Sequence, residues 1–201
     1  MTMIKICGIS REEDTEFINA TKPDYAGFII GVPFSRRNIT AEQACRLRNL
    51  INSDIKTVGV FVDYRKEDIV NLVECGIIDI VQLHGAEDEI FIKELRQLIP
   101  DTEIWKAFVI KNSEDIALAE LSSADKILLD SGTGSGKSFD WSMLADVKRD
   151  FILAGGLNCE NISSAIAQVR PYAVDVSSGV ETDYLKDGAK IQKLCAIVRR
   201  L

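Results

Sequence analysis

Two side chains that can exchange protons each stand at the end of an apolar, β-branched run. Cys7 closes MIKIC at residues 3–7, and Asp130 closes KILLD at residues 126–130. An ordinary thiol has a pKa of about 8.5 and is only slightly ionised at neutral pH, so a base at Cys7 would need a nearby cation. A carboxyl at the rim of an apolar strand can act as a proton donor. The alternatives are a small buried hydrophobe at Cys7 and a simple Asx turn at Asp130.

Two segments near the C-terminus have the composition of a phosphate site. AGGLNCENI at residues 154–162 places two glycines before Asn158, a predicted helix N-cap. Bare N–H groups at a helix N-terminus attract phosphate, and VSSGVE at residues 176–181 adds hydroxyls and a glycine. The candidate phosphate ligands are Gly155, Gly156, Ser177, Ser178 and Gly179. Each segment alone could be a tight turn with positive φ, but neighbouring segments favour phosphate binding.

Three further polar residues complete the set of candidates. Arg36 and Arg37 in GVPFSRRN could pair bidentately with a carboxylate, although exposed arginines are commonly just solvated. His84 in QLHG is the only histidine of the chain. We expect it to be a hydrogen-bonded rim residue rather than the base. No second histidine and no carboxylate spacing suggest a metal site.

The segment DSGTGSGKSFDW at residues 130–141 looks at first like a nucleotide-binding P-loop. That loop needs a glycine, four residues, and then Gly-Lys-Ser or Gly-Lys-Thr. The Gly-Lys-Ser at 136–138 would need a glycine at position 131, which is Ser131, and Gly132 comes one residue too late. The spacing therefore disfavours a P-loop. We expect instead a flexible lid that excludes water when it closes.

Apolar, β-branched runs alternate with amphipathic helical segments along the whole chain. The predicted strands cover residues 3–7, 25–30, 56–62, 79–84, 103–109, 126–130, 151–155 and 173–177. Eight strands, each followed by a helix, predict an α/β fold in which a parallel sheet closes into a (β/α)8 TIM barrel, with residues 1–201 as one domain. An open doubly wound sheet is the alternative, but no early dinucleotide fingerprint supports it.

The barrel explains why the candidates belong together. Active sites of this fold lie at the C-terminal ends of the strands, and the loops after strands 7 and 8 often hold phosphate. Because side chains alternate along a strand, Lys5 and Cys7 share one face while the flanking isoleucines take the other. A lysine inside a barrel must be paired, and Asp175 lies on the strand that neighbours the first one. We therefore predict a contact between Lys5 and Asp175 beneath the site.

Composition limits the classes of partner. The net charge is −7, and the 24 Lys and Arg residues are scattered, which argues against a nucleic-acid or membrane surface. No apolar run approaches the roughly 18 residues that cross a bilayer. Five cysteines without a C-x-x-C pair indicate reduced thiols in the cytoplasm. The expected partner is a small-molecule substrate, and the expected assembly is a monomer or a homodimer.

Six motifs in order along the chain resemble phosphoribosylanthranilate isomerase of tryptophan biosynthesis. They are KICGI at 5–9, GVFVD at 59–63, VQLHGAE at 81–87, GSGKSFDW at 134–141, AGGLNCENI at 154–162 and VDVSSGVE at 174–181. The resemblance runs from residue 5 to the end of the chain. Three departures from the family pattern are Cys159, where proline usually follows GGLN, the short loop after Asp130, and the atypical loop GVPFSRRN.

The resemblance implies an intramolecular Amadori rearrangement without metal or cofactor. N-(5-phosphoribosyl)anthranilate would become 1-(2-carboxyphenylamino)-1-deoxyribulose 5-phosphate. By analogy, Cys7 is the base that takes the proton from ribose C2, and Asp130 is the acid that protonates the ring oxygen. Arg37, or its neighbour Arg36, would hold the anthranilate carboxylate, and the glycine and serine loops would hold phosphate. The supporting residues would be Lys5, Asp175 and His84.

Two other functions are compatible with a phosphate-binding barrel. A metal-dependent pentose-phosphate epimerase would need several histidine and carboxylate ligands, and a single histidine counts against it. A barrel that binds phosphate without catalysis is the other alternative. The presence of both Cys7 and Asp130 counts against that one.

Overall fold

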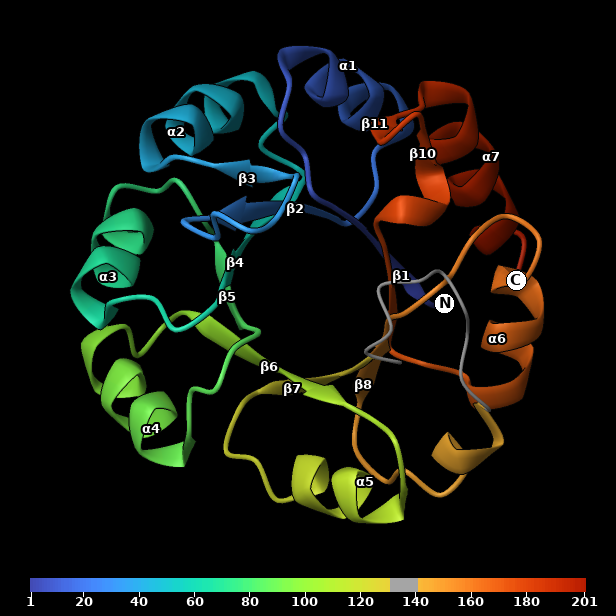
Figure 1. Cartoon of the computed structure of the whole chain (residues 1–201). Coiled ribbons are helices and arrows are strands. Elements are labelled where there is room, and N and C mark those ends of the chain that lie inside the picture. Colours follow the sequence, from blue (N-terminus) through green and yellow to red (C-terminus); the bar gives the residue numbers. More distant parts are fainter. Residues whose placement is uncertain (131–140) are drawn as a thin grey trace.

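Eight parallel strands close into a barrel in the computed structural model, which describes residues 1–130 and 141–201 (Figure 1). The hydrogen-bonded order is β1-β9-β8-β7-β6-β5-β4-β2, and pairing of β1 with β2 closes the ring. The two-residue strand β3 (Asn38–Ile39) adds to β2 outside this ring. The barrel strands are β1 (Met3–Cys7), β2 (Tyr25–Ile30), β4 (Lys56–Phe61), β5 (Ile80–Leu83), β6 (Glu103–Val109), β7 (Lys126–Asp130), β8 (Phe151–Leu153) and β9 (Ala173–Val176). The predicted TIM barrel is confirmed.

Four of the predicted strands are too long at their C-terminal ends. The observed strands stop at Phe61, Leu83, Leu153 and Val176. The residues that directly follow these strand ends line the cavity at the barrel mouth: Val62, His84, Ala154, Gly155 and Ser177. The N–H groups of His84 and Ala154 still donate to the carbonyls of Phe61 and Leu129 on the neighbouring strands, so the sheet ends gradually at this mouth.

An outer ring of helices covers the barrel (Figure 1). It consists of α1 (Glu12–Thr21), α2 (Ala41–Leu50), α3 (Lys66–Glu74), α4 (Glu89–Leu98), α5 (Ser113–Glu120), α6 (Ile162–Val169) and α7 (Gly188–Val198). Side-chain caps explain where several of them begin. The Thr40 hydroxyl accepts a hydrogen bond from the backbone N–H of Gln43, and Asp88 caps α4 through the N–H of Phe91.

The connection between β7 and β8 does not follow the predicted strand–helix alternation. Within its described part it has only the short 3₁₀ helix η1 (Trp141–Leu144). The chain beyond η1 is held by Arg149, whose guanidinium donates to the carbonyls of Ser122 and Ala124. These contacts fix residues 145–150 against the end of α5 in place of a further helical turn.

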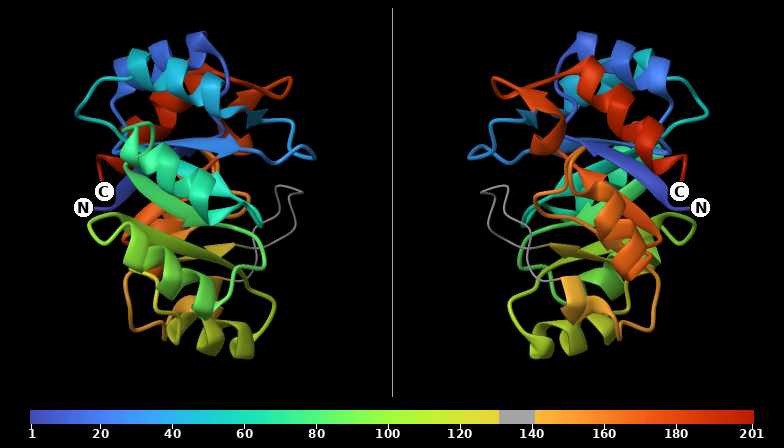
Figure 2. Two further views of the ribbon diagram at one scale, coloured as in Figure 1. Left: turned by 90° about the vertical axis from the view of Figure 1, so that its left-hand side faces the viewer. Right: turned by 90° about the vertical axis from the view of Figure 1, so that its right-hand side faces the viewer.

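Two apolar cores hold the barrel together. The larger one lies between the strands and the helices and includes Ile4 and Ile6 of β1. The smaller one fills the barrel interior, where the Tyr25 and Trp105 rings meet edge to face with centroids 5.1 Å apart. Figure 2 shows both termini at one end of the barrel and the loop after β2 at the other.

Candidate active site

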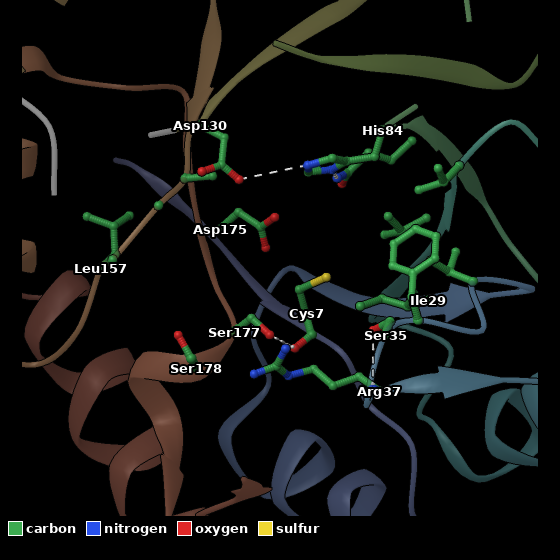
Figure 3. Close-up of a pocket in the computed structure, with 18 residues that line it drawn as sticks. Cys7, Ile29, Ser35, Arg37, His84, Asp130, Leu157, Asp175, Ser177 and Ser178 are labelled. Carbon is green, nitrogen blue, oxygen red and sulfur yellow. Dashed lines mark hydrogen bonds and ion pairs between the residues drawn. The ribbon is translucent and has the colours of Figure 1, made fainter. Parts of the chain in front are cut away.

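A cavity of about 300 Å³ opens at the C-terminal ends of the strands (Figure 3). Strands β1, β7 and β9 and the loops after β2 and β8 all contribute to its wall. Most of the residues that the sequence singles out line it: Cys7, Arg37, His84, Asp130, Gly155, Gly156, Asp175, Ser177 and Ser178. Lys5, Arg36 and Gly179 are not part of this lining.

Beneath the cavity, Lys5 pairs with Asp175 as predicted. The Nζ atom lies 2.9 Å from Oδ2 of Asp175, and the Lys5 side chain is fully buried. Burial lowers the pKa of Lys5, but the Asp175 carboxylate and the neighbouring Cys7 outweigh it, so the pKa is raised and the ammonium stays charged. The register of β1 on β9 explains the contact, because Lys5 and Asp175 are direct partners.

The thiol of Cys7 points into the cavity in Figure 3. Burial raises the pKa of Cys7, and the charge of Lys5 lowers it, with the net result above the ordinary value. The cation that a base at this position requires is therefore present, but burial prevails. The raised pKa keeps Cys7 mainly as the neutral thiol at neutral pH.

Asp130, at the end of β7, faces His84 across the mouth. His84 Nε2 lies 3.8 Å from Oδ2 of Asp130, and its Nδ1 lies 3.0 Å from the amide nitrogen of Gln82 (Figure 3). Burial lowers the pKa of His84 despite the neighbouring carboxylates, so the ring is neutral. The Gln82 amide then donates to Nδ1, and we assign the ring proton to Nε2, facing Asp130. Gln82 was missed in the sequence, although strand alternation puts it on the same face as His84.

The two neighbouring arginines have different surroundings. Arg37 lines the cavity and donates from Nε and Nη2 to the two carboxylate oxygens of Glu181, at 2.6 and 2.7 Å. The Arg36 guanidinium lies 4.2 Å from the centroid of the Tyr184 ring, outside the cavity lining. The geometry therefore favours Arg37 as the arginine available to a ligand. Glu181 was also missed, although it ends the motif VDVSSGVE.

The predicted phosphate segments meet at one side of the cavity. Gly155 and Gly156 have φ values of 90° and 65°, which glycine adopts without strain. The N–H groups of Gly155, Gly156 and Ser178 form no hydrogen bond with an acceptor among the described residues. Gly179 lies behind this surface, where an added Cβ would be 1.9 Å from the carbonyl oxygen of Leu157. Its role here is to let the loops after β8 and β9 touch, rather than to line the cavity.

Asn158 makes the hydrogen bonds of the predicted N-cap, although the regular helix begins later. Its side chain accepts from the N–H groups of Glu160 and Asn161, and its carbonyl accepts from the N–H of Ile162. Helix α6 itself begins at Ile162, and Asn161 directly before it makes no side-chain cap bond. The N–H groups of Glu160 and Asn161 are thus satisfied, which leaves the preceding glycine turn as the anion-binding part of this segment.

The segment expected to act as a lid lies in residues 131–140, outside the described residues, so the lid stays a prediction. In residues 1–130 and 141–201, no group of three or more His, Cys, Asp and Glu side chains could hold a metal ion. No helix in those ranges has both the length and the apolar character that crossing a membrane requires.

Comparison with known proteins assigns the chain to a family. The family profile described as N-(5'-phosphoribosyl)anthranilate (PRA) isomerase matches residues 4–196. The chain belongs to the PRA isomerase family. The PRA isomerase of Endomicrobium trichonymphae is 45% identical over 207 residues, with both chains covered in full. That of Acetivibrio thermocellus is 42% identical over 212 residues, with 99% of this chain and 96% of the relative covered.

Solved PRA isomerase structures have the same fold over their whole length. A monomeric form of the dimeric enzyme from Thermotoga maritima superposes with a TM-score of 0.87 at 38% identity, covering 100% of both chains. A PRA isomerase in complex with reduced 1-(o-carboxyphenylamino)-1-deoxyribulose 5-phosphate gives a TM-score of 0.83 at 36% identity, again covering 100% of both chains. The family named from the sequence motifs is confirmed.

Proposed function

We propose that this chain is an N-(5'-phosphoribosyl)anthranilate isomerase that performs an Amadori rearrangement in tryptophan biosynthesis. One observation carries the proposal: Cys7, Asp130, Arg37 and the Gly155–Gly156 turn all line a single cavity. This arrangement offers a base, an acid and two separate anion sites. A substrate with a carboxylate at one end and a phosphate at the other has one group for each anion site.

The proposed reaction needs one proton donor and one proton acceptor. Asp130 protonates the ribose ring oxygen as its bond to C1 breaks, which leaves an iminium ion between C1 and the anthranilate nitrogen. Cys7, as thiolate, then takes the proton from C2. The electron pair of that C–H bond forms the C1–C2 double bond of an enolamine, which tautomerises to the ketone. No electrons leave the substrate, so the step requires no redox cofactor.

The remaining residues of the site orient the two proton carriers and the substrate. Neutral His84 would donate its Nε2 proton toward Asp130, which supports an acid held in one orientation. Lys5 would stabilise the thiolate of Cys7 once it forms. Arg37 would bind the anthranilate carboxylate, and the N–H groups of the glycine turn would bind phosphate.

The test is a fluorescence assay that follows consumption of phosphoribosylanthranilate by the purified protein. Cys7→Ala and Asp130→Asn should each lower kcat by about 10² or more, because each removes one proton-transfer group. Circular dichroism spectra and inhibition by inorganic phosphate should match the wild type. Unchanged turnover in either folded variant would refute the role given to that residue. Loss of activity in EDTA would support a metal-dependent epimerase instead.

The cellular setting follows from the same proposal. Its partner is the small-molecule substrate, and all five cysteines are free thiols, which supports a cytoplasmic location. The Thermotoga maritima relative is described both as dimeric and as a monomer, which supports a monomer or a homodimer for this chain. Size-exclusion chromatography with light scattering would distinguish the two.

A further inference from the structure

A small hairpin follows the phosphate segment and lies beside the barrel mouth. After the short helix η2 (Ser178–Val180), strands β10 (Glu181–Thr182) and β11 (Leu185–Lys186) pair antiparallel. Figure 1 shows the hairpin between α1 and α7. Glu181 and Lys186 are direct partners in its register. Both side chains are buried, with 6% and 1% of their surface exposed.

Glu181 connects the two candidate anion sites. Its Oε1 and Oε2 atoms accept from Nε and Nη2 of Arg37, at 2.6 and 2.7 Å. The same Oε1 accepts from Nζ of Lys186 at 2.5 Å. Lys186 also donates to the carbonyl oxygen of Ser177 at 3.1 Å and lies 3.4 Å from its hydroxyl. A single buried carboxylate thus touches the cation of the carboxylate site and the lysine beneath the phosphate segment.

The contact with Glu181 determines which edge of Arg37 remains available. A guanidinium has five N–H groups in a rigid plane and can present two forks to two carboxylates. Glu181 takes the fork of Nε and Nη2. The second fork, of Nη1 and the other Nη2 proton, meets no acceptor among the described residues. The Arg37 stem is fixed as well, because it packs where a Cβ at Gly8 would be, with Cδ 2.3 Å from that position.

Arg37, Lys186 and Glu181 together carry one net positive charge, which is available to an anionic ligand. Burial raises the pKa of Glu181, but the hydrogen bonds from Arg37 and Lys186 outweigh it, so the pKa is lowered and the carboxylate stays ionised. Burial lowers the pKa of Lys186, and Glu181 opposes that shift. Removing the charge of Glu181 would therefore release Arg37 from its orientation and leave Lys186 buried without a counter-charge.

Building on the proposed isomerase function, we infer that Glu181 is a positioning residue for both ends of the substrate. It turns the free fork of Arg37 toward the anthranilate carboxylate and holds Lys186 against Ser177 of the phosphate segment. The distance between the two anion sites is then set by one carboxylate that does not touch the reacting atoms.

The experiment measures binding of two inert probes by isothermal titration calorimetry. One is reduced 1-(o-carboxyphenylamino)-1-deoxyribulose 5-phosphate, and the other is the same compound without its carboxyl group. Glu181→Gln should reduce the preference for the carboxylated probe by about tenfold or more, since a charge-assisted bidentate contact loses its orientation. It should also weaken inhibition by inorganic phosphate. Arg37→Ala should remove the preference and leave phosphate inhibition unchanged.

Asp183→Asn is the matched control, because it removes an exposed carboxylate from the same hairpin. It should keep the preference within about twofold of the wild type, as expected for a screened surface charge. A folded Glu181→Gln variant with the wild-type preference would overturn the inference. If that variant does not fold, Glu181→Asp serves instead: its shorter acid cannot hold both cations, and an unchanged preference would again count against Glu181. A wild-type chain that does not convert phosphoribosylanthranilate would refute the proposed function, whereas the probe preference tests Glu181 alone.

Discussion

Gly27 offers a steric probe of how closely the base is held. This residue lies in the middle of β2, directly opposite Cys7 in the pairing of β1 with β2. An added Cβ at Gly27 would lie 2.9 Å from the Cys7 sulfur, 3.0 Å from the Cys7 Cα and 3.1 Å from the Lys5 Nζ. Ordinary contacts of a Cβ begin near 3.4 Å. Gly27→Ala must therefore move the thiol or its neighbouring ammonium by about 0.5 Å or more.

The expected cost differs for stability and for catalysis. Overpacking in a core costs about 1–3 kcal/mol, and replacing glycine by alanine returns about 0.4–1 kcal/mol through the unfolded chain. The free energy of unfolding should therefore fall by at most about 2.5 kcal/mol. A displacement of about 1 Å at a reacting group costs about 10²-fold in rate, so a shift of about half that size should lower kcat/KM about 10- to 100-fold.

The assay combines steady-state kinetics on phosphoribosylanthranilate with urea unfolding. Gly59→Ala on β4 is the control, since the atoms nearest to its Cβ would belong to the side chains of Ile78 and Phe61, each at 2.8 Å. Both of those residues belong to the outer core, away from Cys7. The control should lose a comparable amount of stability and keep kcat/KM within about threefold of the wild type.

Two results would refute this reasoning. If folded Gly27→Ala retains the wild-type kcat/KM, the position of the Cys7 thiol is not critical, and its role as base loses its structural support. If both glycine variants lose activity in proportion to their stability, the effect comes from general loosening of the barrel. The reasoning is supported only if kcat/KM falls much more in Gly27→Ala than in Gly59→Ala. Such a result would show that the position of the Cys7 thiol depends on the absence of a side chain at Gly27.

Three other perturbations give distinct outcomes. Lys5→Met leaves the Asp175 carboxylate buried without its counter-charge, and the free energy of unfolding in urea should fall by about 3–5 kcal/mol; a loss below about 1 kcal/mol would contradict a buried ion pair. Arg37→Ala should raise KM by about tenfold or more with little change in kcat, whereas Arg36→Ala should change KM less than about twofold; the reverse result would assign the carboxylate to Arg36. For His84, burial lowers the pKa in the folded state below its ordinary value of 6.5, so the unfolded chain binds more protons as the pH falls below that value. The wild type should therefore lose stability relative to His84→Asn between about pH 6.5 and pH 5, and a stability difference that is flat over this range would show that the ring is not held neutral.

The sequence predicts well those features that depend on periodicity. Strand alternation and ring closure together place Lys5 next to Asp175, because the first and last barrel strands must pair and both residues point inward. The same reasoning puts Cys7 and Asp130 at one mouth, since parallel strands end at the same side. These predictions need no knowledge of the loops, which is why they survive comparison with the structure.

Two kinds of feature are not predictable in this way: those that depend on the path of a loop, and those that depend on a small difference between large opposing energies. The contact of Glu181 with Arg37 requires a hairpin to fold back beside the loop after β2, and no local pattern indicates that path. The ionisation of Cys7 depends on whether burial or the Lys5 charge prevails, and sequence spacing gives neither magnitude. The regular helix begins at Ile162, four residues after the capping side chain of Asn158, and a capping residue alone does not fix such a boundary.

A second buried ion pair lies outside the barrel interior, between β6 and the loop after β5. Lys106 on β6 places Nζ 3.0 Å from Oε2 of Glu87 and 2.7 Å from the carbonyl oxygen of Gly85. Glu87 also accepts from the N–H groups of Asp63 and Gly85, at 2.7 and 2.8 Å. This pair therefore fixes the backbone directly after β4 and β5, including the residue that follows His84.

Buried ion pairs seldom stabilise a fold more than apolar residues of similar shape would, because desolvation offsets most of their attraction. Stability alone therefore does not explain why the protein buries the pairs Lys5–Asp175 and Lys106–Glu87. Each pair instead bears on a proton carrier. Lys5 sets the charge beside Cys7, and Glu87 anchors the strand end that presents His84 to Asp130. The two buried ion pairs are thus best understood as supports of the base and the acid, one from inside the barrel and one from the loop after β5.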